Sequence, residues 1–408
     1  MLFIIVYFIG NGEYFVSSSQ PIAQNGIVTI EEKELQEKTI LKLDGEWSFY
    51  PNILIASSNS FDAYESEKIP IEVPATWNSF VEPNEEGLTV GTYHVKINVP
   101  VEGEYGLYIR SIRQSNRVFI NGKDVGSKGN PSETLKDFKF ENDDKYTVFA
   151  QSENLMLDIV IHVGNYNYPK SGITFPIEFG TKEAIQRDFS MKILAESFVC
   201  IGYIVFGAIY IISYSQNRKR KEELFLGLFT ILFGLYMSFT NEKVFFLIFT
   251  HLTINEQVRL QLGILPLVDV CLALFLYYLY PEFMRKKAIY IISILLGLLF
   301  FIYGIYNPMT KNSMIIPIEN LVLSQIIFAV IFIPVGLYNV FVLLRVLMKG
   351  VDGSRYILIL LVSLTCYTFL MVMYYIFDIP MVYSEQLLFI FTLYSFASLL
   401  SFRANTSF

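Results

Sequence analysis

The second half of the chain is a series of long apolar runs separated by short polar breaks. A helix crosses the hydrocarbon core of a bilayer with about 20 consecutive apolar residues. Runs of this length that lack residue-by-residue alternation are typical of helices and not of transmembrane β-barrels. The pattern therefore predicts seven membrane-spanning helices, at residues 194–214, 224–240, 258–280, 288–306, 321–344, 356–377 and 386–402.

Basic residues are concentrated in alternate breaks between these runs. The first, third and fifth breaks hold Arg218, Lys219, Arg220 and Lys221, then Arg285, Lys286 and Lys287, then Arg345, Lys349 and Arg355. Cytoplasmic loops carry the excess of Lys and Arg, so these three breaks are expected inside the cell. The chain is therefore predicted to be a multi-pass protein of the cell membrane, with its N-terminal region outside and its C-terminus in the cytoplasm.

The first half of the chain has short runs in which apolar and polar residues alternate. The clearest are Thr92–Val99, Tyr105–Arg110, Arg117–Asn121 and Leu155–Val163, with Gly, Pro, Asn and Asp between them. This pattern predicts half-buried antiparallel strands, and Asn121-Gly122 predicts a tight hairpin because both central positions of that turn need a positive φ. We expect an antiparallel β jelly roll or sandwich over residues 40–180, followed by the helical bundle at 194–403.

Three shorter segments flank these two regions. Residues 1–20 contain a short apolar stretch followed by small residues, which predicts either a signal peptide or an uncleaved N-terminal anchor. Residues 181–193 have helical character and are expected to connect the β-domain to the first span. Residues 404–408 are expected to be a cytoplasmic stub.

Composition supports the membrane assignment and excludes some chemistry. Hydrophobic residues make up 53% of the chain and the mean hydropathy is +0.43, more than a soluble domain usually carries. The net charge of -7 combines an acidic first half with basic inner loops, so nucleic acid is not an expected partner. The three cysteines lie in predicted spans and the three histidines are far apart, so we expect no metal site, no disulfide framework and no cofactor.

Candidate ligand-binding residues in the β-domain are Trp47, Trp77, Arg113 and Asn116. Aromatic rings stack on sugars, but both tryptophans are also suited to the core. Arg113 and Asn116 lie between two predicted strands, where they either meet a ligand or belong to a solvated edge. No pair of carboxylates stands out as catalytic, so we do not expect an enzyme.

Ionisable residues inside a membrane are costly and are therefore functional candidates. Asp269 is the acid placed deepest in a predicted span, and its expected hydrogen-bond partners are Asn320, Gln325 and Asn339. Two roles remain open at this stage: a hydrogen bond that stabilises the bundle, or a ligand-binding or switching role.

Several short motifs in the β-domain carry a resemblance to a known family. They are Leu43-Asp44-Gly45-Glu46-Trp47 with Phe49, Val73-Pro74-Ala75-Thr76-Trp77-Asn78, Gly91-Thr92-Tyr93, and Val118-Phe119-Ile120-Asn121-Gly122 with Gly126. Their order resembles the sugar-binding jelly-roll domain of family-two glycoside hydrolases. With seven spans behind it, the chain resembles the bacterial seven-transmembrane receptors that carry diverse intracellular signalling modules.

The resemblance implies a sensor that binds an extracellular small molecule, such as a carbohydrate, and acts as a homodimer. It also implies a histidine kinase or diguanylate cyclase as output module, whereas this sequence ends shortly after the last predicted span. We therefore expect either a truncated or split sensor half, or a chain that acts on a separate cytoplasmic partner through its inner loops. The alternatives are a transporter or permease component with a solute path near Asp269, and an intramembrane enzyme, for which the spans hold few suitable residues.

Overall fold

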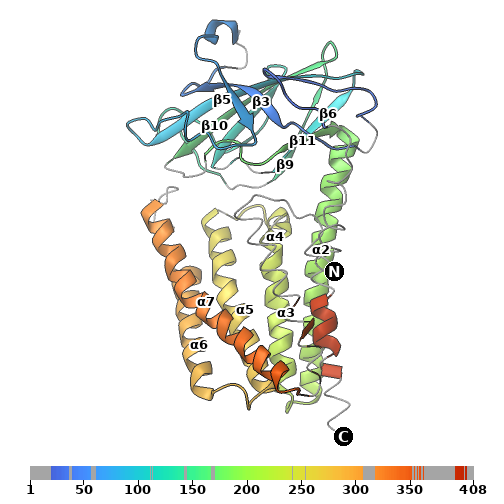
Figure 1. Cartoon of the computed structure of the whole chain (residues 1–408), viewed down its shortest axis with the longest axis vertical. Helices are drawn as coiled ribbons and strands as arrows, with labels where there is room; N and C mark the ends of the chain where they lie inside the picture. The colour runs from blue at the N-terminus through green and yellow to red at the C-terminus, as the bar shows by residue number, and fades with distance from the viewer. Residues whose placement is uncertain are drawn as a thin grey trace. The chain divides into compact units, whose positions relative to one another are not determined.

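The computed structural model describes residues 20–351 except 36–38, 57–60, 111, 113, 142–144, 167–170, 241, 253 and 307–317; beyond 351 it describes a few single residues and most of 391–401. The chain divides into two compact units (Figure 1). One consists mainly of residues 17–192 and contains the strands. The other consists mainly of residues after 192 and contains the helices.

The strands form two sheets. Within the described residues, sheet A has the order β4-β3-β5-β10-β7-β8, with β1 paired in parallel to β5, and sheet B has the order β2-β11-β6-β9. Sheet A consists of β1 (Ile27–Thr29), β3 (Gly45–Pro51), β4 (Ile69–Val73), β5 (Leu88–Asn98), β7 (Ser115–Ile120), β8 (Lys123–Lys128) and β10 (Met156–Tyr166). Sheet B consists of β2 (Leu41–Lys42), β6 (Glu104–Ile109), β9 (Tyr146–Gln151) and β11 (Ile177–Thr181).

The four strands read most clearly from the sequence are confirmed as β5, β6, β7 and β10. The predicted hairpin is confirmed as well, since Asn121 and Gly122 join β7 to β8 with φ values of 50° and 74°. Among the described residues, these strands pair in the antiparallel direction except where β1 lies parallel to β5. The antiparallel β-domain is therefore present, and its strand order is dominated by partners that are distant in sequence.

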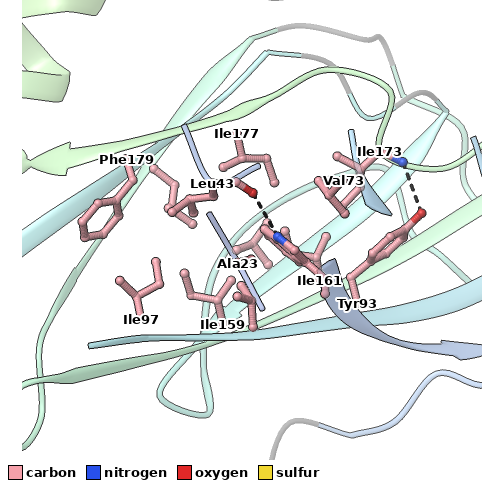
Figure 2. Close-up of a cluster of buried hydrophobic side chains, with 14 of the residues drawn as sticks. Ala23, Leu43, Val73, Tyr93, Ile97, Ile159, Ile161, Ile173, Ile177 and Phe179 are labelled. Atoms are coloured by element: carbon pink, nitrogen blue, oxygen red, sulfur yellow. Dashed lines mark hydrogen bonds between the residues drawn. The ribbon is translucent and has the colours of Figure 1, made fainter. Parts of the chain in front are cut away.

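The core of the β-domain is made by alternate residues of both sheets. Ile159 and Ile161 of β10 and Ile177 and Phe179 of β11 belong to one buried cluster, which Figure 2 shows from close by. Burying a side chain of this size contributes about 1.5 to 3 kcal/mol relative to exposing it. Because side chains alternate along a strand, each sheet also has a second face that points away from this core.

The helices of the second unit follow the predicted spans closely where they are described. They are α2 (Lys182–Gln216), α3 (Lys221–Ser238), the short α4 (Val244–Ile248), α5 (Ile254–Leu279), α6 (Lys286–Phe300) continuing as the π-helix η3 (Phe301–Tyr306), and α7 (Ile318–Met348). Helices α2, α5, α6 with η3, and α7 are long and apolar enough to span a membrane. The sixth predicted span falls mostly outside the described residues, and the seventh is described as helical at residues 391–398, 400 and 401, so a total of seven stays a prediction.

Glycines bring two pairs of helix backbones into contact. A Cβ atom on Gly207 of α2 would lie 2.6 Å from the carbonyl oxygen of Gly227 on α3, and one on Gly263 of α5 would lie 2.7 Å from the Cα of Gly304 in η3. Small residues that allow such approach are characteristic of helix packing within membranes. Each contact fixes which side of a helix faces its neighbour.

Candidate functional site

The two tryptophans are core residues. Both side chains are fully buried, and the indole Nε1 of Trp47 donates a hydrogen bond to the carbonyl of Leu43 over 2.9 Å. The ring of Trp77 stacks on Tyr93 with centroids 5.8 Å apart. Neither ring presents a surface to solvent, which agrees with the core interpretation of these residues. Stacking of a ligand on Trp47 or Trp77 stays a prediction, and the burial of both rings does not support it.

Asn116 also has a structural environment. Its side chain is buried, its Nδ2 donates to the carbonyl of Ile112 over 3.0 Å, and its Oδ1 accepts from the hydroxyl of Tyr146. Both ends of the amide are therefore engaged within the β-domain. Arg113 lies outside the described residues.

Asp269 and Asn339 are not partners. Among the described residues, Oδ2 of Asp269 and both side-chain polar atoms of Asn339 are buried without a hydrogen-bond partner. Asp269 lies ten residues before the end of α5, roughly 15 Å along the helix axis. Tyr338, next to Asn339, instead accepts a 3.4 Å hydrogen bond from the backbone N–H of Arg285, just before α6. The expected pair is therefore separated along the helices. The side chains of Asn320 and Gln325 are not among those that the structure describes.

A face of sheet A that points away from the core carries a mixture of aromatic and charged side chains. We call it the outer face of sheet A and define it by the residues that alternate with core residues on its four inner strands: Ser48 and Tyr50 of β3; Thr92, His94 and Lys96 of β5; Asp158, Val160 and His162 of β10; Arg117 and Phe119 of β7. The pairing register places Phe119, Val160, His94 and Ser48 in one row across the strands.

Two polar pairs lie on this face. The Nε2 atom of His94 is 2.5 Å from Oδ1 of Asp158, and the imidazole stacks on Phe61 with centroids 4.1 Å apart and planes 11° apart. On the other side of the row, Nε of Arg117 donates to Oδ2 of Asp124 in β8 over 2.7 Å. Each pair holds its members in a defined position, and the second carboxylate oxygen of Asp124 also accepts a hydrogen bond from the backbone N–H of Gly126 over 3.2 Å.

Phe119 lies between these pairs. It is partly exposed, the guanidinium carbon of Arg117 is 5.8 Å from its centroid, and the ring of His162 meets it edge-on with centroids 4.9 Å apart. Nε2 of His162 is 2.6 Å from the carbonyl oxygen of Ile55, so this nitrogen carries the hydrogen. Burial lowers the pKa of His162 below its ordinary value, which keeps the imidazole neutral.

The corresponding outer face of sheet B is covered by the start of α2. Ala184 and Ile185 in the first turn of the helix are buried, and Lys182 pairs with Glu104 of β6 over 2.8 Å. Lys192 follows Lys182 by about three turns of α2. Its Nζ atom lies 3.0 Å from Oε2 of Glu178 on β11 and 2.6 Å from Oδ2 of Asp188. The same ammonium group is 4.4 Å from the ring centroid of Tyr108 on β6. We call Lys192, Glu178, Asp188 and Tyr108 the Lys192 cluster.

Sequence reasoning missed both of these arrangements. The alternation in β7 and β10 identified residues that share a face, but Phe119, His94 and Asp158 come from three strands whose pairing the sequence does not state. Lys192 lies on a helix and Glu178 on a strand, so their spacing in the sequence follows neither the helical nor the strand period. The only available signal was an acid in the middle of the otherwise apolar run Ile177–Phe179.

Comparisons with known proteins add little to this geometry. No protein-family model matches the chain, and no curated protein matches it. Among solved structures, it is similar to a GH2 β-galacturonidase from Eisenbergiella tayi, at 15% identity over 36% of this chain and 25% of that one, with a TM-score of 0.25.

Two further solved structures are β-glucuronidases. The one from Ruminococcus gnavus matches at 15% identity over 35% of this chain and 30% of that one, with a TM-score of 0.26. The one from Lactobacillus rhamnosus matches at 15% identity over 38% of this chain and 30% of that one, with a TM-score of 0.25. The chain thus spans less than a third of the length of each, and a similarity this partial assigns it neither activity nor substrate.

Proposed function

We propose that this chain is the input part of a membrane receptor. The β-domain binds a small molecule outside the cell, with a carbohydrate as the proposed class, and the helices relay the change to a cytoplasmic signalling partner. No catalytic step belongs to this proposal. A homodimer, an output module of the histidine kinase or diguanylate cyclase type, and an N-terminal domain outside the cell are part of it.

One observation carries the proposal: α2 belongs to both units. Its first turns pack on sheet B through buried apolar residues and the Lys192 cluster, and the same helix continues to Gln216 as an apolar segment long enough to span a membrane. A separate linker would let the β-domain move without consequence for the helices. Because α2 is continuous, a ligand that favours one conformation of the β-domain would also favour one conformation of α2. The size of this shift is set by the difference between the ligand's affinities for the two conformations.

The test uses the full chain in lipid nanodiscs with a panel of sugars and cell-wall oligosaccharides. A compound that binds the folded form raises the melting temperature of the β-domain. Hydrogen exchange in α2 and α3 is then measured with and without that compound. We expect exchange to change in both helices. Binding that leaves exchange in all described helices unaltered would contradict the relay.

The second candidate function is a transporter or permease component. It is favoured by a single observation, the buried Oδ2 of Asp269 without a partner among the described residues, because such groups in membranes mark solute or ion pathways. Solute uptake into proteoliposomes that is abolished by Asp269→Asn, while ligand binding by the β-domain is retained, would replace the receptor proposal by this one.

A further inference from the structure

We propose that one end of the unit that contains the helices binds the headgroups of anionic phospholipids. This inference goes beyond the receptor function and does not depend on it, because it concerns the lipid around the helices. The surface is formed by residues 217–223 between α2 and α3, residues 281–287 between α5 and α6, and residues 345–351 at the end of α7, and we call it the basic end. Its cations are Arg218, Lys219, Arg220, Lys221, Arg285, Lys286, Lys287, Arg345 and Lys349.

The three segments of the basic end lie at the same end of the helices. There α2 ends, α3 begins, α5 ends, α6 begins and α7 ends (Figure 1). Nζ of Lys221, at the start of α3, lies 5.3 Å from the ring centroid of Tyr278 near the end of α5. The backbone N–H of Arg285, just before α6, donates to the hydroxyl of Tyr338 on α7 over 3.4 Å. The fold therefore brings cations from three places in the sequence to one surface.

The positive charge of the basic end is not neutralised by the described part of the chain. Its three segments contain nine cations but only three carboxylates, those of Glu222, Glu223 and Glu282. Arg220 pairs with the buried Glu223 over 3.0 Å. The other eight cations are exposed and have no carboxylate partner among the residues that the structure describes. An anionic partner from outside the chain can therefore reach them.

Stability of the helices does not explain cations at these positions. Lys221 is the first residue of α3, and Lys286 and Lys287 are the first two residues of α6. The N-terminal end of a helix carries a partial positive charge, so cations in the first turn are unfavourable. Helices long enough to span a membrane end at this surface, so lipid phosphates are the anions nearest to it. A bound phosphate would offset the repulsion.

Two of the cations are followed along their helices by an aromatic ring and then by aliphatic groups. Nζ of Lys286 lies 5.8 Å from the ring centroid of Tyr290, one turn further into α6. The guanidinium carbon of Arg345 lies 5.8 Å from the ring centroid of Phe341, one turn earlier in α7. These two aromatic side chains are 59% and 53% exposed. Towards the middle of the two helices the exposed side chains include Ile291, Ile294, Leu298, Val330, Ile333 and Leu337.

This order of groups matches a phospholipid. Aromatic side chains are typical of the level between lipid headgroups and acyl chains, and basic side chains extend from there towards the headgroups. A phospholipid can contact the cations and the aliphatic turns together, because its phosphate and its acyl chains belong to one molecule. An acidic soluble protein or free phosphate would contact the cations alone. Each cation near an anionic membrane surface strengthens the attraction by about fivefold.

The experiment measures lipid binding to the purified full chain in uncharged detergent micelles. The probes are phosphatidylglycerol and phosphatidylcholine with identical acyl chains and the same fluorophore on one chain, so that only the headgroup differs. The site variants are the double substitution Lys286→Gln with Arg345→Gln, and the single substitution Tyr290→Leu. The matched control is Arg259→Gln, which removes an exposed cation near the start of α5, at the opposite end of that helix from the basic end.

We expect the wild type to bind phosphatidylglycerol roughly tenfold or more tightly than phosphatidylcholine. The double substitution should reduce this preference by roughly fivefold or more, because two cations are lost. Tyr290→Leu should reduce it by about twofold, because both cations remain and only the ring beside Lys286 is removed. Arg259→Gln should leave the preference unchanged, and higher ionic strength should weaken it in the wild type.

Three outcomes would overturn the inference. Equal affinity of the wild type for the two lipids would leave an acidic protein surface as the partner of these cations. An equal loss in Arg259→Gln and in the double variant would show that net charge, and not the basic end, sets the preference. Displacement of phosphatidylglycerol by millimolar inorganic phosphate would assign the surface to a free anion. Lys349 is exposed in the turn after α7, so Lys349→Gln replaces the double variant if that variant fails to fold. Each of these outcomes leaves ligand binding by the β-domain, and hence the receptor proposal, unaffected.

Discussion

The two sheets of the β-domain use ion pairs on their outer faces in opposite ways. On sheet B, the side chains of Lys192 and Glu178 are only 14% and 11% exposed, because α2 covers them. On sheet A, the side chains of Arg117 and Asp124 are 45% and 40% exposed. Exposed pairs contribute little to stability, whereas loss of one member of a buried pair leaves an uncompensated charge. The Lys192–Glu178 pair on sheet B therefore holds a helix in place, whereas the Arg117–Asp124 pair on sheet A is solvated and holds no other element.

The comparison is easily measured because the chain has two tryptophans and both lie in the core of the β-domain. Their fluorescence reports unfolding of this domain even when the helices are in lipid.

Replacing Lys192 should produce the largest loss. Lys192→Met keeps much of the side chain but leaves Glu178 and Asp188 without their shared cation, so we expect the free energy of unfolding of the β-domain to fall by about 3 kcal/mol. The matched control is Lys182→Met on the same helix, whose pair with Glu104 is 32% and 44% exposed and should cost about 0.5 kcal/mol or less. Similar losses in the two variants would remove the distinction between the buried and the exposed pair.

On sheet A, Asp158→Asn should have an intermediate effect. The substitution weakens the bond to His94 but keeps the shape of the side chain, and we expect a loss of about 1 kcal/mol in the free energy of unfolding. Asp124→Asn, which alters the more exposed pair with Arg117, serves as the control and should stay within about 0.5 kcal/mol of wild type. A larger loss in the control than in Asp158→Asn would reverse our ranking of the two pairs.

The smallest effect concerns pH and His162. Because burial lowers the pKa of this imidazole in the folded protein, the unfolded chain takes up a proton first as the pH falls below about 6.5. The stability that His162 contributes is therefore present above that pH and declines below it, until the folded pKa is reached. His162→Gln retains a donor for the carbonyl of Ile55 and should show a flatter decline of melting temperature between pH 7 and pH 5. Parallel curves for variant and wild type would exclude this contribution.

Local patterns predicted much of the fold. The alternation in Thr92–Val99 and Leu155–Val163 identified β5 and β10, and Asn121-Gly122 identified a turn, because each depends on neighbouring residues alone. Alternation could not say which strands pair, so the row from Phe119 to His94 was not predictable. It also could not distinguish a tryptophan that stacks on a ligand from one that fills a core. Hydropathy likewise placed Asp269 in a span, but it could not give the depth of Asn339 relative to Asp269.

The unbroken course of α2 has a consequence for the angular relation between its two ends. Successive residues of an α-helix are rotated by about 100° around its axis, so Lys192 and Gly207 have a fixed angle between them. One residue inserted after Lys192 would turn Gly207 by about 100° around the helix axis relative to Lys192 while adding only about 1.5 Å of length. Seven inserted residues would add about 10 Å but turn the helix by only about 20°. This segment should therefore tolerate changes of length in steps of seven residues and resist changes of one.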